Sequence, residues 1–343
     1  MSSSPRRRIL SPRRVPRRGI VIAVIVLAAV IVVGAIAAVG IAVTQGVHAM
    51  LAQPPAVGTT VIAPQQSKAR IALENLPMDA DATTGTTYLA AQPTAYWLTP
   101  ERDPIGTVGG TVLDLIAQAR DQKRATAMVV YGLPDRDCGN HSAGGLSPAD
   151  YPRWVAEIGN ALKTAPDQQK IIILEPDSIA LTSECGDVAT RAGFLSGAVD
   201  ALSSTATWIY IDGGHSAWHS PDEMTQLIRQ MGIIDRVRGV ATNVSNYQST
   251  YDEFAYAHAL SDRLGGAHAI IDTSRNGVAT AGGTWCNPSG QRVGDATGTF
   301  GDDVVDTNLW IKPPGESDGV CNGGPAAGLW WPAAAAELTG GVR

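Results

Sequence analysis

The chain has 343 residues, a length that suits one large α/β domain with an appendage or two ordinary domains. Hydrophobic residues make up 44% of it and charged residues 17%, which provides ample material for a core and excludes a disordered chain. Its formal net charge is −6, but seven arginines lie within the first 18 residues, and without them 19 basic residues face 32 acidic ones. Phosphate backbones would repel a body this acidic, so we expect no nucleic acid partner.

The N-terminus combines a basic flank, residues 1–18, with an uncharged apolar run over residues 19–43. At about 1.5 Å per residue, a helix over this run would cross the ~30 Å hydrocarbon core of a bilayer. The run exceeds the usual length of a signal-peptide hydrophobic region, which favours an uncleaved membrane anchor, although the small residues around Ala49 offer a cleavage site. In both cases we expect the rest of the chain to be exported, either secreted or membrane-anchored.

Export bears on the four cysteines, Cys138, Cys185, Cys286 and Cys321. In an oxidising compartment an even number of cysteines indicates disulfides, and no CxxC pair of the kind that binds metal is present. Four cysteines allow three connectivities, of which the simplest joins sequence neighbours, Cys138 to Cys185 and Cys286 to Cys321. Each of these loops would contribute ~3–4 kcal/mol in the chain-entropy model.

The rest of the sequence divides into a linker and one domain. Residues 44–92 are rich in polar and small residues without a sustained apolar period, so we interpret them as a linker before a single domain over residues 93–343. In that domain short β-rich runs alternate with helical patterns such as residues 148–163, which place Trp154 on an apolar face. The predicted strands cover residues 95–98, 127–133, 170–174, 207–211, 237–243, 267–271 and 307–311. This alternation predicts an α/β fold with a parallel sheet, and the lack of a glycine-rich nucleotide motif predicts no cofactor.

Carboxylates follow five of the predicted strands. They include Asp137, Glu175, Asp177, Asp212, Asp272, Glu316 and Asp318. Because the carboxyl ends of parallel strands converge on one face, we expect these groups to meet in one cleft. Any one of them alone would more often be a helix cap or a turn residue. Together their repulsion and burial would raise one pKa, giving the neutral acid and the ionised base that glycoside hydrolysis needs.

Tryptophan is unusually frequent, with eight tryptophans against three phenylalanines. A flat indole covers the apolar face of a sugar ring while its N–H donates a hydrogen bond. Trp97, Trp218 and Trp285 lie beside strand ends or the Cys286 loop and are candidate sugar platforms, whereas Trp154 is assigned to the core.

Several long motifs together resemble glycoside hydrolase family 6, the inverting cellulases that include endoglucanases and cellobiohydrolases. They lie at residues 129–138 with 142–145, 171–180, 212–215, 241–244, 285–287 and 309–319. The resemblance covers about residues 93–331 and preserves the family's motif order. It implies a distorted parallel β/α barrel with seven strands, and it pairs the cysteines as sequence neighbours.

The resemblance also implies roles for single residues. Asp177 matches the general acid that protonates the glycosidic oxygen, and Asp137 the neighbour that raises its pKa and helps to relay a proton from water. Asp318 matches the proposed base, a role disputed in this family because a chain of waters is the rival proton carrier. Tyr131 matches a tyrosine under the distorted sugar, and Ser142 lies in the loop that closes over it. The positions that match residues binding sugar hydroxyls are Asp212, His215, Asn243, Lys312 and Glu316.

Cellobiohydrolases of the family cover the cleft with long loops, one of which is inserted just before the last cysteine. Here Asp318 and Cys321 are separated by two residues, and residues 322–325 form a brief turn. An open cleft admits a polymer in mid-chain, so the expected activity is that of a monomeric endo-β-1,4-glucanase acting on a β-1,4-glucan such as cellulose.

Three alternatives remain open at this point. A cellobiohydrolase of the same family is the nearest. A metal-dependent hydrolase would use Asp212, His215 and His219, but an HxxxH spacing without the HExxH glutamate is a weak signal, and we expect no metal. A non-catalytic glycan-binding wall protein would keep the cleft without turnover, against which the retained carboxylates argue.

Overall fold

The structure is a computed structural model that describes residues 22, 24–36, 40, 43, 47, 52–140, 142–185, 187–280 and 284–340, without the side chain of Cys185. The chain forms two units, Met1–Met50 and Leu51–Arg343. In the first unit the described residues are helical and exposed. Within the described part of the chain, no helix has both the length and the apolar character to span a bilayer. Part of the run over residues 19–43 lies outside the described residues, so the membrane anchor stays a prediction.

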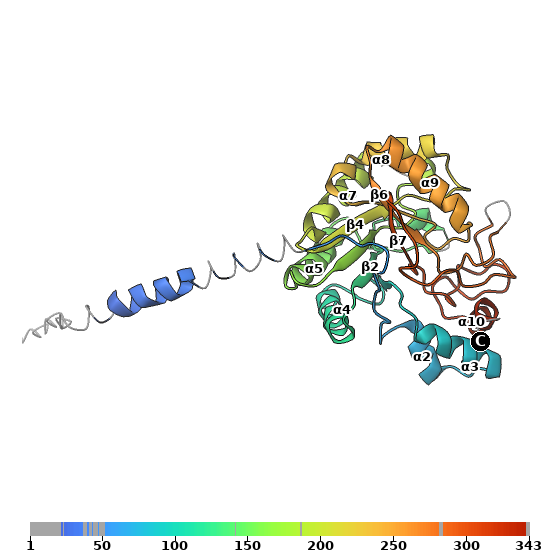
Figure 1. The fold of residues 1–343 in the computed structure, drawn as a ribbon, viewed down its shortest axis with the longest axis horizontal. Coiled ribbons are helices and arrows are strands. Elements are labelled where there is room, and N and C mark those ends of the chain that lie inside the picture. Colours follow the sequence, from blue (N-terminus) through green and yellow to red (C-terminus); the bar gives the residue numbers. More distant parts are fainter. Residues whose placement is uncertain are drawn as a thin grey trace, which may run out of the picture. The chain divides into compact units, whose positions relative to one another are not determined.

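The second unit is built on a curled sheet whose seven described strands are all parallel and follow sequence order (Figure 1). The strands are β1 (Tyr96–Leu98), β2 (Thr126–Val130), β3 (Lys170–Leu174), β4 (Thr207–Asp212), β5 (Gly239–Thr242), β6 (His268–Asp272) and β7 (Val305–Leu309). The sheet curls until the N–H of Ala95, next to β1, donates to the carbonyl of Trp310, next to β7, at 2.9 Å. The predicted distorted barrel of seven parallel strands is confirmed.

Successive side chains of the strands enter two different cores. In β3, Ile171 and Ile173 pack inside the barrel, whereas Ile172 and Leu174 pack against the outer helices. Both faces of the strand are therefore buried, which explains why it reads as an unbroken apolar run and was easy to locate in the sequence.

Helices cover the outer face of the sheet (Figure 1). They are α4 (Val108–Gln122), α5 (Tyr151–Lys163), α7 (Val188–Leu202), α8 (Pro221–Met231) and α9 (Thr250–Arg263), with the short α6 (Thr182–Cys185), η1 (Asp137–Gly139) and η2 (Ile234–Arg236) between them. The helix predicted over residues 148–163 begins three residues later than expected. Its Trp154 is 0% exposed and donates its Nε1 hydrogen to the carbonyl of Asp103 at 2.7 Å, which confirms the core assignment.

The predicted linker over residues 44–92 is wrong for its described part, because residues from 52 onward belong to the compact second unit. Val61 is fully buried and bridges to Ala125 next to β2. Two helices follow, α2 (Lys68–Asn75) and α3 (Ala80–Ala90), and α3 packs on the C-terminal α10 (Pro332–Thr339) (Figure 1). Gly85 permits this close approach, since a Cβ there would lie 2.6 Å from the carbonyl oxygen of Ala335. Helices this short, rich in Thr and Ala, leave little apolar periodicity in the sequence.

Candidate active site

The site begins where β3 and β4 end. Glu175 and Asp177 both adopt positive φ angles, 48° and 66°, so the chain turns sharply after β3. The turn directs the backbone N–H of Asp177 to Oδ2 of Asp212, which accepts it at 3.1 Å. The two strand-end loops are thereby joined through Asp212, which was predicted as a sugar ligand.

Asp177 has the electrostatics of a proton donor. Burial raises its pKa well above the usual 3.8, and the negative charges of Asp212 and Asp137 raise it further, while Lys312 opposes them. The residue keeps part of its surface exposed, so a substrate can reach it. A carboxylic acid that stays protonated near neutral pH can donate a proton to a leaving group.

Asp212 differs from its predicted role as a sugar ligand. Only 1% of it is exposed, and its Oδ2 accepts the N–H groups of Asp177 and Gly214. Burial raises its pKa to about 7 against the effect of these two hydrogen bonds. The surroundings therefore assign Asp212 to holding and tuning Asp177 rather than to contacting the sugar.

Asp137, Ser142 and Tyr131 form a chain of hydrogen bonds beside Asp177. Oδ2 of Asp137 accepts the backbone N–H of Ser142 at 2.8 Å and its hydroxyl at 2.9 Å, and the Ser142 and Tyr131 hydroxyls lie 2.8 Å apart. Burial and the neighbouring Asp177 charge raise the pKa of Tyr131, which keeps it a neutral phenol. The ring of Tyr131 meets that of Trp97 edge-on, with centroids 5.2 Å apart. The predicted acid, its neighbour, the loop serine and two aromatic rings are thus brought together.

A second cluster extends from Trp97. The Nε1 hydrogen of Trp97 goes to the carbonyl of Ile311, and Nζ of Lys312 lies 5.2 Å from the centroid of a Trp97 ring. Lys312 pairs with Glu316 at 3.4 Å, and Lys68 pairs with the other carboxylate oxygen of Glu316 at 3.1 Å. Burial would raise the pKa of Glu316, but the two lysines outweigh it and hold the pKa low. Lys68 comes from α2, inside the supposed linker, and the sequence carries no local signal for this pairing.

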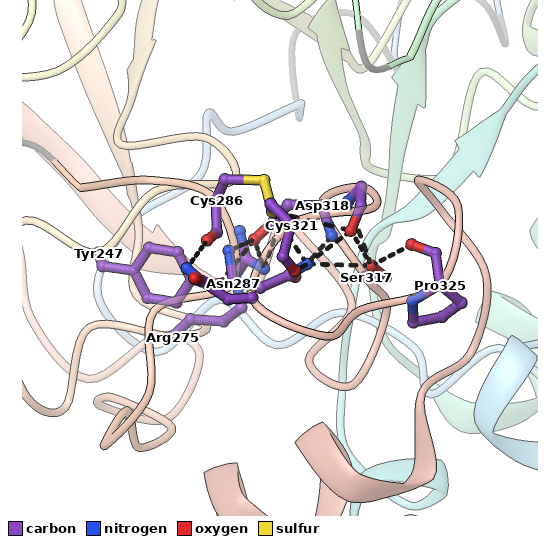
Figure 2. The surroundings of a disulfide bond; sticks show 10 residues. Tyr247, Arg275, Cys286, Asn287, Ser317, Asp318, Cys321 and Pro325 are labelled. Carbon is purple, nitrogen blue, oxygen red and sulfur yellow. Dashed lines mark hydrogen bonds and ion pairs between the residues drawn. A yellow bond between two sulfur atoms is a disulfide. The ribbon is translucent and has the colours of Figure 1, made fainter.

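Asp318 is surrounded by hydrogen-bond donors (Figure 2). Nη1 of Arg275 donates to both carboxylate oxygens, at 2.8 and 3.0 Å, while the Tyr247 hydroxyl and the N–H of Asn287 donate to Oδ2 at 2.8 and 3.1 Å. Accepting a proton from water would disturb one or more of these bonds. The arrangement therefore gives no special support to Asp318 as the base, a role that stays a prediction. Arg275, Tyr247 and Asn287 were not predicted as site residues.

A disulfide joins Cys286 to Cys321, with Cα atoms 6.2 Å apart, which confirms that predicted pair. Asn287 links the same two segments, because its side-chain oxygen accepts the N–H of Asp318 and its Nδ2 group donates to the carbonyls of Gly319 and Cys321 (Figure 2). Cys138 is also disulfide-bonded. The Cys185 side chain lies outside the described residues, so that pairing stays a prediction.

Other predicted sugar ligands lie in varied surroundings. His215 is 5% exposed, and burial, followed by the nearby His219, lowers its pKa to about 4, so it is neutral near pH 7. Trp218 stacks on His219 with ring centroids 5.4 Å apart, and Trp285 is 43% exposed. Asn243 has no exposed surface. It donates to the carbonyl of Asp272 and accepts the N–H of Gln248, so it holds a loop instead of meeting the cleft.

Two strand-end carboxylates hold loops in place. Glu175 is fully buried and accepts the N–H groups of Gly132 and Leu133. Asp272 accepts four backbone N–H groups, those of Ser245, Ser274, Ile311 and Lys312. Among the described residues, no group of three or more His, Cys, Asp and Glu side chains is arranged to hold a metal ion.

The chain is similar over most of its length to proteins of one known family. The model of the family described as "Glycosyl hydrolases family 6" matches residues 57–341. Endoglucanase A of Cellulomonas fimi is 42% identical over 256 residues, which make up 74% of this chain and 56% of that protein. Endoglucanase 1 of Streptomyces sp. (strain KSM-9) is 40% identical over 261 residues, 74% of this chain and 70% of that protein. The chain therefore spans little more than half the length of the first of these curated relatives.

A solved structure shares the fold. The endoglucanase Cel6 from Mycobacterium tuberculosis, in complex with methyl-cellobiosyl-4-deoxy-4-thio-β-D-cellobioside, has a TM-score of 0.74 and 34% sequence identity. The match covers 82% of this chain and 97% of that one.

Proposed function

This chain belongs to glycosyl hydrolase family 6, and on that premise we propose that it is an endoglucanase that hydrolyses internal β-1,4 bonds of cellulose or a related β-glucan. The observation that carries the proposal is the environment of Asp177, a partly exposed carboxyl whose pKa is raised by burial and by Asp212 and Asp137. Endoglucanases at 42% and 40% identity support the substrate class.

In the proposed reaction Asp177 donates its proton to the glycosidic oxygen as the bond to the leaving sugar breaks. A water attacks the opposite face of the sugar ring, which inverts the anomeric configuration. Tyr131 lies under the reacting sugar, and the hydrogen bonds from Asp137 through Ser142 fix the loop above it. The proton released by the water leaves through Asp318 or through a chain of waters.

The endo mode rests on the shortness of one segment beside the site. Only two residues separate Asp318 from Cys321, and their segment is pinned by the Cys286 bridge, so this stretch cannot form a long cover over a bound chain. A polymer then binds in mid-chain. The test is carboxymethyl cellulose viscometry. A steep fall in viscosity for few new reducing ends supports the endo mode, whereas a slow fall with cellobiose as the dominant early product overturns it in favour of a cellobiohydrolase.

We also propose that the hydrolase unit acts outside the cytoplasm as a monomer, secreted or anchored through residues 19–43. The Cys286–Cys321 disulfide supports an oxidising compartment, and the arginine-rich flank before an apolar run supports export. Protease protection in intact cells and in membrane fractions distinguishes a secreted from an anchored form.

A further inference from the structure

A cavity of about 770 Å³ lies behind the Asp318 and Glu316 side of the candidate site and away from Asp177, sharing Tyr247, Arg275 and Glu316 with that side. Its walls come from the segments after β5, β6 and β7, which contribute Tyr247, Arg275 and Glu316, and from the start of α10, which contributes Trp331. Asp177 does not line this cavity, and neither do Asp137, Ser142 and Tyr131. Its volume falls in the ~300–1,000 Å³ range of small-molecule sites.

Contacts connect this cavity to the reaction site in a short series of steps. Tyr131 touches Trp97, Lys312 lies over Trp97, and Lys312 is paired with Glu316 at 3.4 Å. Glu316 is in turn one wall of the cavity. The ion pair of Lys312 and Glu316 therefore lies between Trp97 and the cavity.

The lining has the chemistry of a site for an uncharged polyhydroxylated ligand. It presents hydroxyls, amides and one half-buried indole, namely Thr280, Thr284, Ser289, Gln291, Asn322 and Trp331. Oε1 of Gln291 is buried without a hydrogen-bond partner among the described residues, although only 6% of that residue is exposed. Such an acceptor gains from a hydroxyl donor placed beside it.

The charges around the cavity are largely compensated. Arg275 is bound to Asp318, and Glu316 lies between Lys68 and Lys312. The third charged residue, Glu337, accepts the N–H of Gly290. An anionic or cationic ligand finds no unpaired buried counter-charge here, whereas a neutral sugar needs none.

Two segments that line the cavity are fixed to each other. The Cys286–Cys321 bridge joins the segment of Ser289 to that of Asn322, and the Asn287 side chain ties the same segments by hydrogen bonds (Figure 2). A rigid cavity loses less conformational entropy on binding a ligand than a mobile cavity does.

We propose that this cavity is a distal subsite that binds glucosyl residues of the same glucan chain beyond Glu316, with Trp331 as its stacking platform. The inference rests on the proposed function, since it assigns the ligand from that substrate. It adds a specificity determinant: substrates long enough to reach Trp331 gain affinity, and shorter ones do not.

The test uses the full chain and compares cellotetraose with cellohexaose. We expect Trp331→Ala to lower the ratio of kcat/KM for cellohexaose to that for cellotetraose about tenfold and to leave the cellotetraose value unchanged. Trp331→Phe should restore most of the ratio. Val278→Trp fills the cavity from a side chain that is 46% exposed and should lower the ratio in the same way without removing any packing. Tyr251→Ala removes an aromatic ring that is 83% exposed outside this cavity and should leave the ratio unchanged.

Two further readouts separate this proposal from a structural effect and from failure of the proposed function. End-labelled cellohexaose should be cut at different positions by Trp331→Ala and by the wild type, which a loss of stability alone would not produce. Calorimetric titration of cellohexaose into an Asp177→Asn background measures binding without turnover. An unchanged ratio and cutting pattern in both cavity variants overturn the subsite. A wild type that hydrolyses no β-glucan but binds cellohexaose more tightly than its Trp331→Ala counterpart overturns the function and supports the subsite.

Discussion

Replacing Asp212 with asparagine tests whether Asp177 is the proton donor, because Asp212 is the carboxylate that most raises the Asp177 pKa after burial. In the wild type the N–H of Asp177 donates to Oδ2 of Asp212 at 3.1 Å. Asparagine keeps the shape of the side chain and an oxygen that accepts this N–H. The acid must be protonated to act, so activity is lost as the pH rises through its pKa. Removing the negative charge of Asp212 lowers that pKa. The alkaline limb of the kcat profile should therefore move towards acid.

The same substitution has a measurable effect on stability. Folding raises the pKa of Asp212 from 3.8 to about 7, so its contribution to stability is fully present below the unfolded pKa and is lost as the pH rises through about 7. Between pH 3.8 and about pH 7, the unfolding free energy that this group contributes therefore falls by about 4 kcal/mol. Asp212→Asn does not titrate, so its unfolding free energy relative to the wild type should increase by up to that amount between pH 4 and pH 8, measured by denaturant unfolding.

Glu253→Gln is the matched control. Glu253 is also fully buried, burial raises its pKa to about 7, and its Oε1 accepts the N–H of Ser216. Since Glu253 does not act on Asp177, this variant should change stability with pH in the same direction and leave the alkaline limb in place. An alkaline limb that stays put in Asp212→Asn, with normal folding, would refute the assignment of Asp177 as an acid tuned by its neighbour.

Three other predictions can be tested with the same protein. Asp177→Ala should reduce turnover on cellulose ~10²–10⁴-fold and affect an aryl glycoside with a good leaving group less; near-normal cellulose turnover contradicts the role. Early-time NMR should show the α-anomer released from a β-glucan, and initial β-product rules out inversion. Lys68→Met leaves Glu316 with one counter-charge, so KM for cellotetraose should rise several-fold with kcat nearly unchanged. Two control variants should preserve KM: Lys68→Arg, which keeps the charge, and Lys163→Met, which removes a charge at the exposed end of α5. A KM unaffected by Lys68→Met would show that the ion pair plays no part in binding.

The strands could be predicted because consecutive apolar residues in the sequence mark each buried strand. β3, with five consecutive buried residues, was predicted with both ends correct, and the strands after it differ from their predicted ranges by a few residues at most. The linker prediction failed for the opposite reason. Residues 52–92 bury one short run, residues 61–64, and otherwise scattered positions, and they approach α10 through Gly85, so no sustained period results.

The site was predictable to the extent that it follows strands. Asp212 ends β4, while Asp137, Asp177 and Asp318 lie in the segments that follow β2, β3 and β7, and the parallel sheet brings those segments to one edge. Lys68 shows the limit of that logic, since it reaches Glu316 from a helix that precedes the barrel and has no motif of its own. Arg275, Tyr247 and Asn287 are similar cases, because what marks them is their shared contact with Asp318, a property of the folded chain alone.

The carboxylates that follow the strands differ in how many hydrogen bonds they accept. Residue type alone therefore predicts more catalytic carboxylates than the structure supports. Asp272 receives four backbone N–H groups and Glu175 two, so their charges stabilise the loops on which the site is built. Asp177 differs because, among the described residues, no hydrogen bond to its carboxyl oxygens is found, while burial and the negative charges of Asp212 and Asp137 outweigh Lys312 and part of its surface stays exposed. Burial and the charges of Asp212 and Asp137 favour the protonated form of this carboxyl, and that form is the one that bond cleavage consumes.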